Sequence, residues 1–196
     1  MGDIKSAWEI AMEKVAKLSE ATEEERLKWK YEPEGEILAS RYTNGDCNLV
    51  DELSQYEENV MKYVINGIMG VLSRNISMPK NDSIKKANKK AMDGIKVLKK
   101  DKVATENVFS NIRRVFEHYG GQGEQQRKHA YEQLKIEFDE KIRQAMQQQP
   151  GSFSAVNINV ESQPQFQGEW QRLQTQLDSQ YVRLLHEYKQ ELLSIS

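Results

Sequence analysis

Residues 165–194 read QFQGEWQRLQTQLDSQYVRLLHEYKQELLS, and this stretch decides the fold class. Its large apolar side chains recur every three or four residues, which is the spacing of one buried face of an α-helix. The members of this stripe are Phe166, Trp170, Leu173, Leu177, Tyr181, Leu184, Tyr188 and Leu192. A helix with one apolar stripe and polar residues elsewhere needs a partner that covers the stripe.

Residues 124–148 offer that partner, because Glu, Lys, Arg and Gln surround a second apolar stripe there. The second stripe consists of Tyr131, Leu134, Phe138, Ile142 and Ala145. We expect the two helices to form an antiparallel hairpin with arms roughly 37 and 45 Å long, at a rise of about 1.5 Å per residue. The predicted fold class is therefore all-α, with a helical bundle body and a long C-terminal antiparallel hairpin.

The loop of this hairpin contains a short alternating run at residues 156–160. Val156, Ile158 and Val160 alternate with polar residues, and Pro150 and Pro164 bracket the run. This pattern is typical of a β-strand, which needs a second strand to satisfy its backbone groups. The alternative is an extended loop laid over the helix ends, and the sequence leaves both open.

Before the hairpin, apolar periodicity predicts helices at about 4–19, 22–30, 48–74, 84–100 and 105–119. Pro33 and Gly35 should end the second of them. Gly67 and Gly70 in the central helix, 48–74, should let another backbone approach closely. We expect an N-terminal helical body at 1–119, a Gly-rich linker at 120–123 and the hairpin at 124–196. The hairpin either packs on the body as one domain or projects from it.

Composition and charge limit the classes of protein to which this chain can belong. Charged residues make up 30% of the chain and hydrophobic residues 38%, which suits long solvated helices. Residues 1–60 carry fifteen acids and seven bases, net −8, whereas residues 74–102 carry ten bases and three acids, net +7. The most apolar run, 60–72, is shorter than the roughly 20 residues that span a bilayer. The single cysteine, Cys47, allows no intramolecular disulfide, so we expect a cytoplasmic protein.

The sequence lacks the residues that known catalytic and metal-binding motifs require at their fixed spacings. A di-iron bundle needs Glu-x-x-His pairs, but no acid precedes His118, His129 or His186 by three residues. His186 and Glu187 begin a zinc-protease motif that Gln190 interrupts. Residues 120–123 lack the lysine of a phosphate-binding loop. We therefore expect no catalytic residue, no metal and no cofactor.

The lysine-rich helix 84–100 is a candidate site for polyanions. Its cationic face consists of Lys85, Lys86, Lys89, Lys90, Lys96, Lys99 and Lys100. Such a face could hold nucleic-acid phosphates or lie on anionic lipid. The helix has no arginine and no aromatic residue that would read or stack bases, so a solvated lysine face is the competing interpretation.

Three stretches carry a resemblance to a known family. They are residues 3–9 (DIKSAWE), 89–94 (KKAMDG) and 163–170, which runs from Gln-Pro-Gln-Phe to Trp170. Taken whole, the chain resembles members of a bacterial family of uncharacterised helical proteins. The resemblance implies helices and a bacterial source, but no activity and no site residue.

The leading hypothesis for function is a non-enzymatic protein that acts through protein contacts or self-association along the hairpin. Its candidate anchors are Phe138, Trp170, Tyr181 and Tyr188, because large aromatic residues dominate interface energies. Aromatic stripes also form cores, which is the competing interpretation of the same residues. The alternative hypothesis is a nucleic-acid-associated protein that uses the lysine-rich helix.

Overall fold

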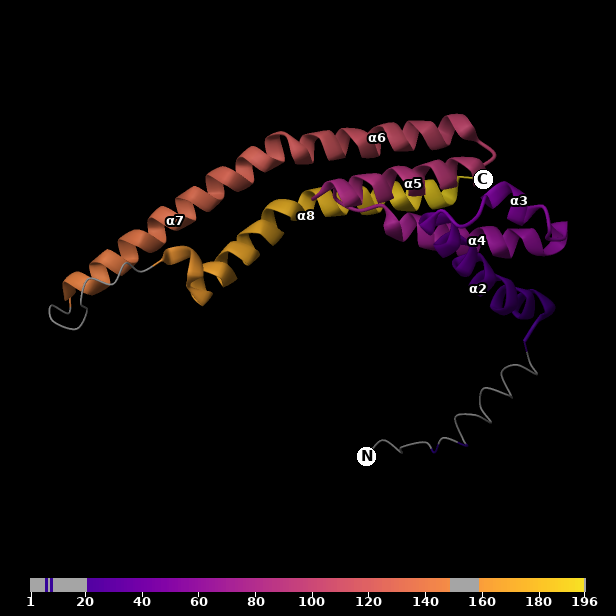
Figure 1. The fold of residues 1–196 in the computed structure, drawn as a ribbon, viewed down its shortest axis with the longest axis horizontal. Coiled ribbons are helices and arrows are strands. Elements are labelled where there is room, and N and C mark those ends of the chain that lie inside the picture. Colours follow the sequence, from indigo (N-terminus) through magenta and orange to yellow (C-terminus); the bar gives the residue numbers. More distant parts are fainter. Residues whose placement is uncertain (1–5, 7, 9–20, 149–158, 196) are drawn as a thin grey trace. The chain divides into compact units, whose positions relative to one another are not determined.

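The computed structural model describes residues 6, 8, 21–148 and 159–195 (Figure 1). Within these ranges every regular element is helical and no strand occurs, so the protein is all-α, as predicted. The predicted helix 4–19 lies almost entirely outside the described residues, and so do residues 156–158 of the expected strand. At its described end the run is not a strand, which was one of the two interpretations that the sequence left open. Val160 begins the 3₁₀ helix η1 (Val160–Ser162), because the Asn159 side chain accepts a hydrogen bond from the Glu161 amide and turns the backbone.

The helices divide between two compact units, which are described separately. The first comprises residues 1–76 and 86–100, with α2 (Glu23–Asn44), α3 (Leu49–Leu53), α4 (Glu58–Asn75) and most of α5 (Asp82–Leu98). The second comprises residues 77–85 and 101–196, with α6 (Lys102–Gly120), α7 (Gln122–Gln148), η1 and α8 (Pro164–Ser194). The sequence-based division assigns α6 to the N-terminal body, whereas by contact α6 groups with α7 and α8.

In the first unit, α2 is one continuous helix packed against α4. Thr22 and Glu25 form the capping box that begins it. The predicted break after Lys30 is wrong, because Pro33 lies inside the helix. Close packing explains why the helix continues: a Cβ atom on Gly35 would lie 2.1 Å from the Val64 carbonyl oxygen, and one on Gly67 equally close to that of Glu32. Backbone contact at these glycines and burial of the neighbouring α2 side chains outweigh the hydrogen bond that proline removes.

The predicted central helix, 48–74, is interrupted in the structure. α3 ends at Leu53, and α4 begins only at Glu58. The Ser54 hydroxyl donates a 2.7 Å hydrogen bond to the Asp51 carbonyl, which gives the chain an alternative to the next helical turn. The prediction for Gly67 is confirmed, whereas Gly70 faces open space.

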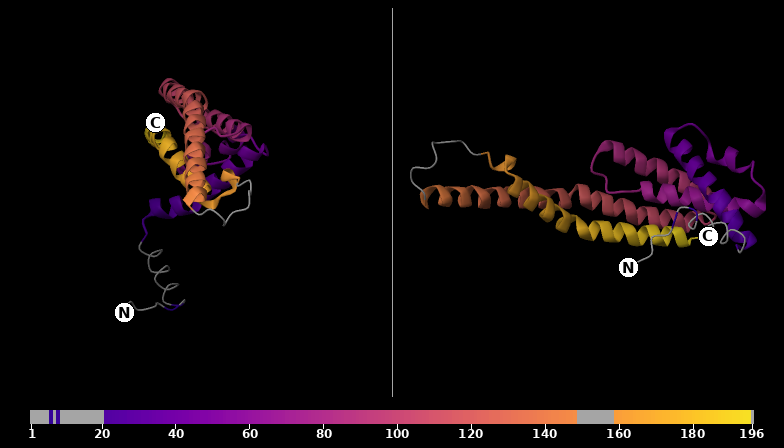
Figure 2. Two further views of the ribbon diagram at one scale, coloured as in Figure 1. Left: turned by 90° about the vertical axis from the view of Figure 1, so that its left-hand side faces the viewer. Right: turned by 90° about the horizontal axis from the view of Figure 1, so that it is seen from below.

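In the second unit, α8 lies beside two consecutive helices. Figures 1 and 2 show α6 and α7 following one another as a bent rod, with α8 alongside both. The sequence-based hairpin gives α8 only α7 as its partner. In the structure α7 contacts the N-terminal half of α8, and α6 contacts the C-terminal half.

An aromatic cluster joins α7, η1 and the start of α8. Its buried centre is Leu134, Val160 and Phe166, surrounded by Tyr131, Phe138, Ile142 and Trp170. Its rings meet edge to face, with centroids 5.4 Å apart for Phe138 and Phe166, and 5.0 Å apart for Tyr131 and Trp170. This geometry is the preferred one for aromatic pairs, so the cluster stabilises the packing of α7 against the start of α8.

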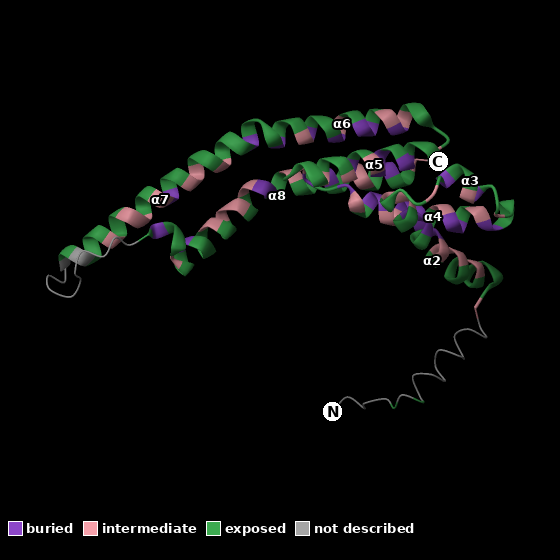
Figure 3. Ribbon diagram, viewed as in Figure 1, coloured by how far each residue is buried: buried purple, intermediate pink, exposed green. Residues whose placement is uncertain are grey.

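The buried face of α8 departs from the predicted stripe towards its C-terminus (Figure 3). Leu184, a predicted member, is 36% exposed, whereas its neighbour Leu185 is only 5% exposed. The buried positions Asp178, Leu185 and Leu192 are seven residues apart. A seven-residue spacing keeps one face of a long helix against its neighbours. The prediction is therefore wrong for Leu184, whose place is taken by Leu185, and confirmed for Leu192.

Candidate functional site

A polar cluster lies where α6 passes into α7, and its centre is Asp178 of α8. This carboxylate is only 7% exposed, and an ionised group at such a position needs partners. Arg127 donates a hydrogen bond to its Oδ1 atom at 3.1 Å, and the Tyr119 hydroxyl donates to Oδ2 at 3.2 Å. The Lys80 ammonium lies 3.9 Å from Oδ2. The buried carboxylate therefore has hydrogen-bond partners at both oxygens.

Arg127 also fixes the junction of α6 and α7. Its guanidinium donates to the carbonyl oxygen of Tyr119 at 2.9 Å, in the last turn of α6, where carbonyl groups lack helical partners. The same group lies 4.0 Å from the centre of the Tyr119 ring. Burial raises the pKa of the Tyr119 phenol, and the negative charge of Asp178 adds to the rise. Tyr119 therefore remains a neutral donor to the carboxylate.

Tyr181 connects this cluster to α6. Its ring packs edge to face on Tyr119, with centroids 5.3 Å apart, and its hydroxyl lies 2.8 Å from Nδ1 of His118. The direction of that hydrogen bond depends on the histidine tautomer. A Cβ atom on Gly123 would lie 2.8 Å from the Tyr181 hydroxyl oxygen. A glycine at this position therefore leaves room for Tyr181 at the start of α7.

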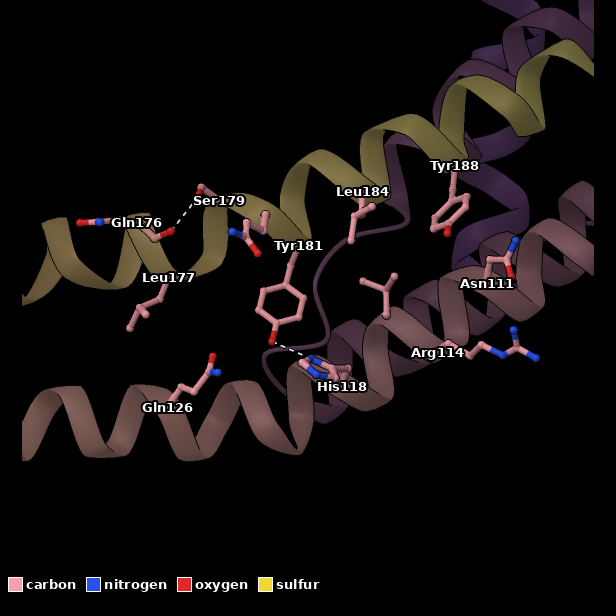
Figure 4. Close-up of a pocket in the computed structure, with 12 residues that line it drawn as sticks. Asn111, Arg114, His118, Gln126, Gln176, Leu177, Ser179, Tyr181, Leu184 and Tyr188 are labelled. Atoms are coloured by element: carbon pink, nitrogen blue, oxygen red, sulfur yellow. Dashed lines mark hydrogen bonds between the residues drawn. The ribbon is translucent and has the colours of Figure 1, made fainter.

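A groove of about 840 Å³ lies beside the polar cluster, and we call it the α6–α8 groove. Its lining residues are Asn111, Arg114, Val115, His118, Gln126, Gln176, Leu177, Ser179, Gln180, Tyr181, Leu184 and Tyr188. Figure 4 shows Leu177, Leu184 and Tyr188 pointing from α8 towards the opposite helix wall. The surface combines apolar side chains with amides and one arginine, which suits binding by packing and hydrogen bonds.

The groove carries few groups suited to bond-making chemistry. No acid is among its lining residues, and His118 is already hydrogen-bonded to Tyr181. Within the described part of the chain, no group of three His, Cys, Asp or Glu side chains could hold a metal ion. What the arrangement can do is hold a molecule along two helices.

The four candidate anchors lie in three different surroundings. Phe138 and Trp170 belong to the aromatic cluster, where their rings contact other residues of the same chain. Tyr181 belongs to the polar cluster. Only Tyr188 lines the groove without a ring contact or hydrogen bond to another described residue. The structure therefore brings Tyr181 and Tyr188 to one groove and places Phe138 and Trp170 elsewhere.

The sequence named Tyr181 and Tyr188 of this site as candidate anchors but missed Asp178 and Arg127. Asp178 escaped because the search for a buried stripe looked for apolar residues, and the motif counts made for His118 could not reveal its hydrogen bond to Tyr181. One signal was available: Asp178 stands seven residues before Leu185 and fourteen before Leu192. An acid in register with buried leucines indicates a buried ion pair, although its partner Arg127 is 51 residues away.

The lysine-rich helix is α5, and its seven lysines differ in their surroundings. Lys90 and Lys99 are half-buried, and the others are exposed. The Lys90 ammonium lies 4.3 Å from the centre of the Tyr42 ring, and Lys85 pairs with Asp82 at 2.9 Å. Burial lowers the pKa of Lys99. Lys86, Lys89 and Lys100 remain as exposed cations without an ion pair to the described residues.

Comparison with known proteins identifies the family. A model described as "Family of unknown function (DUF6657)" matches residues 50–194, and the chain belongs to that family. The match includes α4 to α8 and with them the polar cluster and the α6–α8 groove. No curated protein and no solved structure matches the chain. None of the described helices is both long and apolar enough to cross a membrane.

Proposed function

We propose that this member of the family is a non-enzymatic helical protein that binds another protein through the α6–α8 groove. The observation that carries the proposal is Tyr188, a large aromatic side chain that lines the groove and has no partner among the described residues. Tyrosine is enriched among the residues that dominate protein interfaces, because it gives a large contact area and one hydrogen bond at little entropic cost.

The construction of the groove supports this function. The Arg127–Asp178 ion pair and the Tyr181–His118 hydrogen bond hold α8 against α6 and α7 at one end of it. A groove whose walls are held by its own side chains is preorganised, and preorganisation lowers the entropic cost of binding. The bound protein is either a second copy of this chain or a different protein.

Site-specific photocrosslinking tests the proposal. A benzophenone amino acid replaces Tyr188 in one variant and Gln190 in a matched control, since Gln190 is exposed on α8 but does not line the groove. We expect a discrete protein adduct from position 188 and none from position 190. Light scattering of the purified chain then distinguishes self-association from binding of another protein. A strict monomer with the same adducts, or none, at both positions would contradict the proposal.

A second candidate function is binding of nucleic acid through α5. It is supported by Lys86, Lys89 and Lys100, because exposed and unpaired cations can replace the counterions of phosphates. The test is an electrophoretic shift at low salt. Replacing Lys85, Lys86, Lys89 and Lys90 by Gln should abolish the shift, whereas replacing Lys28, Lys30, Lys62 and Lys128 should not. Equal shifts for both variants would remove this candidate.

We also propose that the protein is cytoplasmic and of bacterial source. Cys47 supports a reducing compartment, because a single cysteine allows no disulfide within the chain. A bacterial source rests on the sequence resemblance alone. Fractionation of the native cell, followed by detection of the chain, tests the compartment.

A further inference from the structure

We propose that the occupant of the α6–α8 groove is an acidic, amphipathic helix of a partner protein. This inference rests on the proposed function and adds the chemical class of the partner. It follows from three properties of the groove, which are the type of its walls, its length and the charges along it.

The walls of the groove require an occupant that binds through side chains. α6, α7 and α8 satisfy their backbone groups internally, so an extended peptide would find no free strand edge to pair with. A small metabolite generally needs several unpaired polar groups that converge on it. Here His118 and Tyr181 are paired with each other, and the amides are divided among α6, α7 and α8. A helix laid into a groove is the recognition mode that remains.

The length and pattern of the groove specify the dimensions of this helix. On α8 the lining extends from Gln176 to Tyr188, which is about 18 Å at the rise of an α-helix. An occupant of roughly twelve residues, or three turns, covers this distance. Leu177, Leu184 and Tyr188 present apolar surface along that length, so the occupant needs apolar residues at positions i, i+4 and i+7.

The charges along the groove select an acidic occupant. Arg114 is exposed, lines the groove and makes no ion pair with a described residue, whereas its neighbour Arg113 is paired with Glu106. Glu117, one turn further along α6, does not line the groove. A carboxylate on the occupant can therefore form a two-pronged hydrogen bond with Arg114. His118, Gln126 and the α8 amides add no negative charge that would oppose it.

Peptide binding to the full chain tests this inference. Two fluorescent sixteen-residue helical peptides share the same apolar positions, and they carry either Glu or Lys at every flanking position. Fluorescence anisotropy should give at least about tenfold tighter binding of the Glu peptide, the effect of one charged hydrogen bond. Arg114→Glu should remove or reverse this preference. Arg113→Glu is the matched control, with the same charge change one residue away, and should leave the preference intact.

Three results would overturn the inference. They are equal or tighter binding of the Lys peptide, equal loss in the Arg113→Glu and Arg114→Glu variants, and no binding of the Glu peptide. Circular dichroism confirms that each variant remains folded. The crosslinking at position 188 is independent of these peptides. A specific adduct there together with a failed peptide test would retain the protein-binding function and reject the acidic helix as the occupant.

Discussion

The two units of this protein pack their helices in opposite ways. In the first unit, α2 and α4 meet backbone to backbone, because Gly35 and Gly67 have no side chains to separate them. In the second unit, large side chains such as Phe166 and Tyr181 keep α8 apart from α6 and α7. Two helices that meet at glycines leave no space between their backbones. Large side chains hold two helices further apart and fill only part of the space between them.

This difference indicates where a ligand can bind. The α6–α8 groove and a second groove of about 880 Å³, lined by α8 and by residues of the segment 77–84, both belong to the second unit. The first unit has a smaller hollow of about 420 Å³ beside Lys86 and Lys90. The spaced helices supply both a core and an accessible surface, which supports the proposed binding site in the second unit.

The largest expected effect breaks the glycine contact. Gly35→Ala places a Cβ atom against the Val64 carbonyl oxygen, which cannot move without shifting α4. We expect a loss of about 4 kcal/mol in unfolding free energy, at the upper end for overpacking. Urea denaturation followed by circular dichroism gives the value, and hydrogen exchange should show faster exchange in α2 and α4. Gly70→Ala is the control: it faces open space and should stabilise α4 by about 0.5–1 kcal/mol. Similar values for both variants would contradict this account.

The next effect breaks the buried ion pair. Asp178→Ala leaves Arg127 without its carboxylate, and we expect a loss of about 3 kcal/mol in unfolding free energy. The double variant Arg127→Met, Asp178→Leu removes both charges and should lose less than Asp178→Ala does alone. A loss in the double variant as large as that of Asp178→Ala, or larger, would contradict this account.

A smaller effect removes one hydrogen bond from the same cluster. Tyr119→Phe keeps the ring packing on Tyr181 but deletes the hydroxyl that donates to Asp178. Since Arg127 still pairs with this carboxylate, we expect a loss of about 1 kcal/mol in unfolding free energy. Thermal unfolding measures it. A loss as large as that of Asp178→Ala would mean that the Tyr119 hydroxyl, and not Arg127, is the main partner of the Asp178 carboxylate.

The smallest effect concerns the surface pair beside the aromatic cluster. The Lys135 ammonium donates to Glu161 at 2.8 Å and lowers the pKa of this exposed carboxyl from 4.5. A lowered folded-state pKa stabilises the protein above the unfolded value, and the contribution is lost as the pH falls through the folded value. Glu161→Gln should therefore lower the melting temperature by only about 1 °C at pH 7, and the difference should vanish in acid, where Glu161 is protonated in the folded chain as well. A larger change in melting temperature at low pH than at pH 7 would contradict this predicted pH dependence.

The sequence predicted what depends on local periodicity. The fold class, the capped start of α2, and the burial of Phe166 and Leu134 all follow from the spacing of residues on one helix. Pro33 misled the prediction, because its local penalty is outweighed by the contact of Gly35 with α4, far away in the sequence. Asp178 was missed for a related reason: nothing near it in the sequence reveals Arg127. The candidate site consists of such distant pairs, so little of it was predictable.

The contact of Gly123 with Tyr181 has a consequence for the evolution of the family. A side chain at position 123 and the tyrosine hydroxyl cannot occupy the same space. Relatives with a larger residue at 123 should therefore carry a smaller one at 181. An insertion within α7 or α8 that shifts position 123 relative to position 181 should be rare. These paired changes would mark the members of the family that keep α8 in the same register.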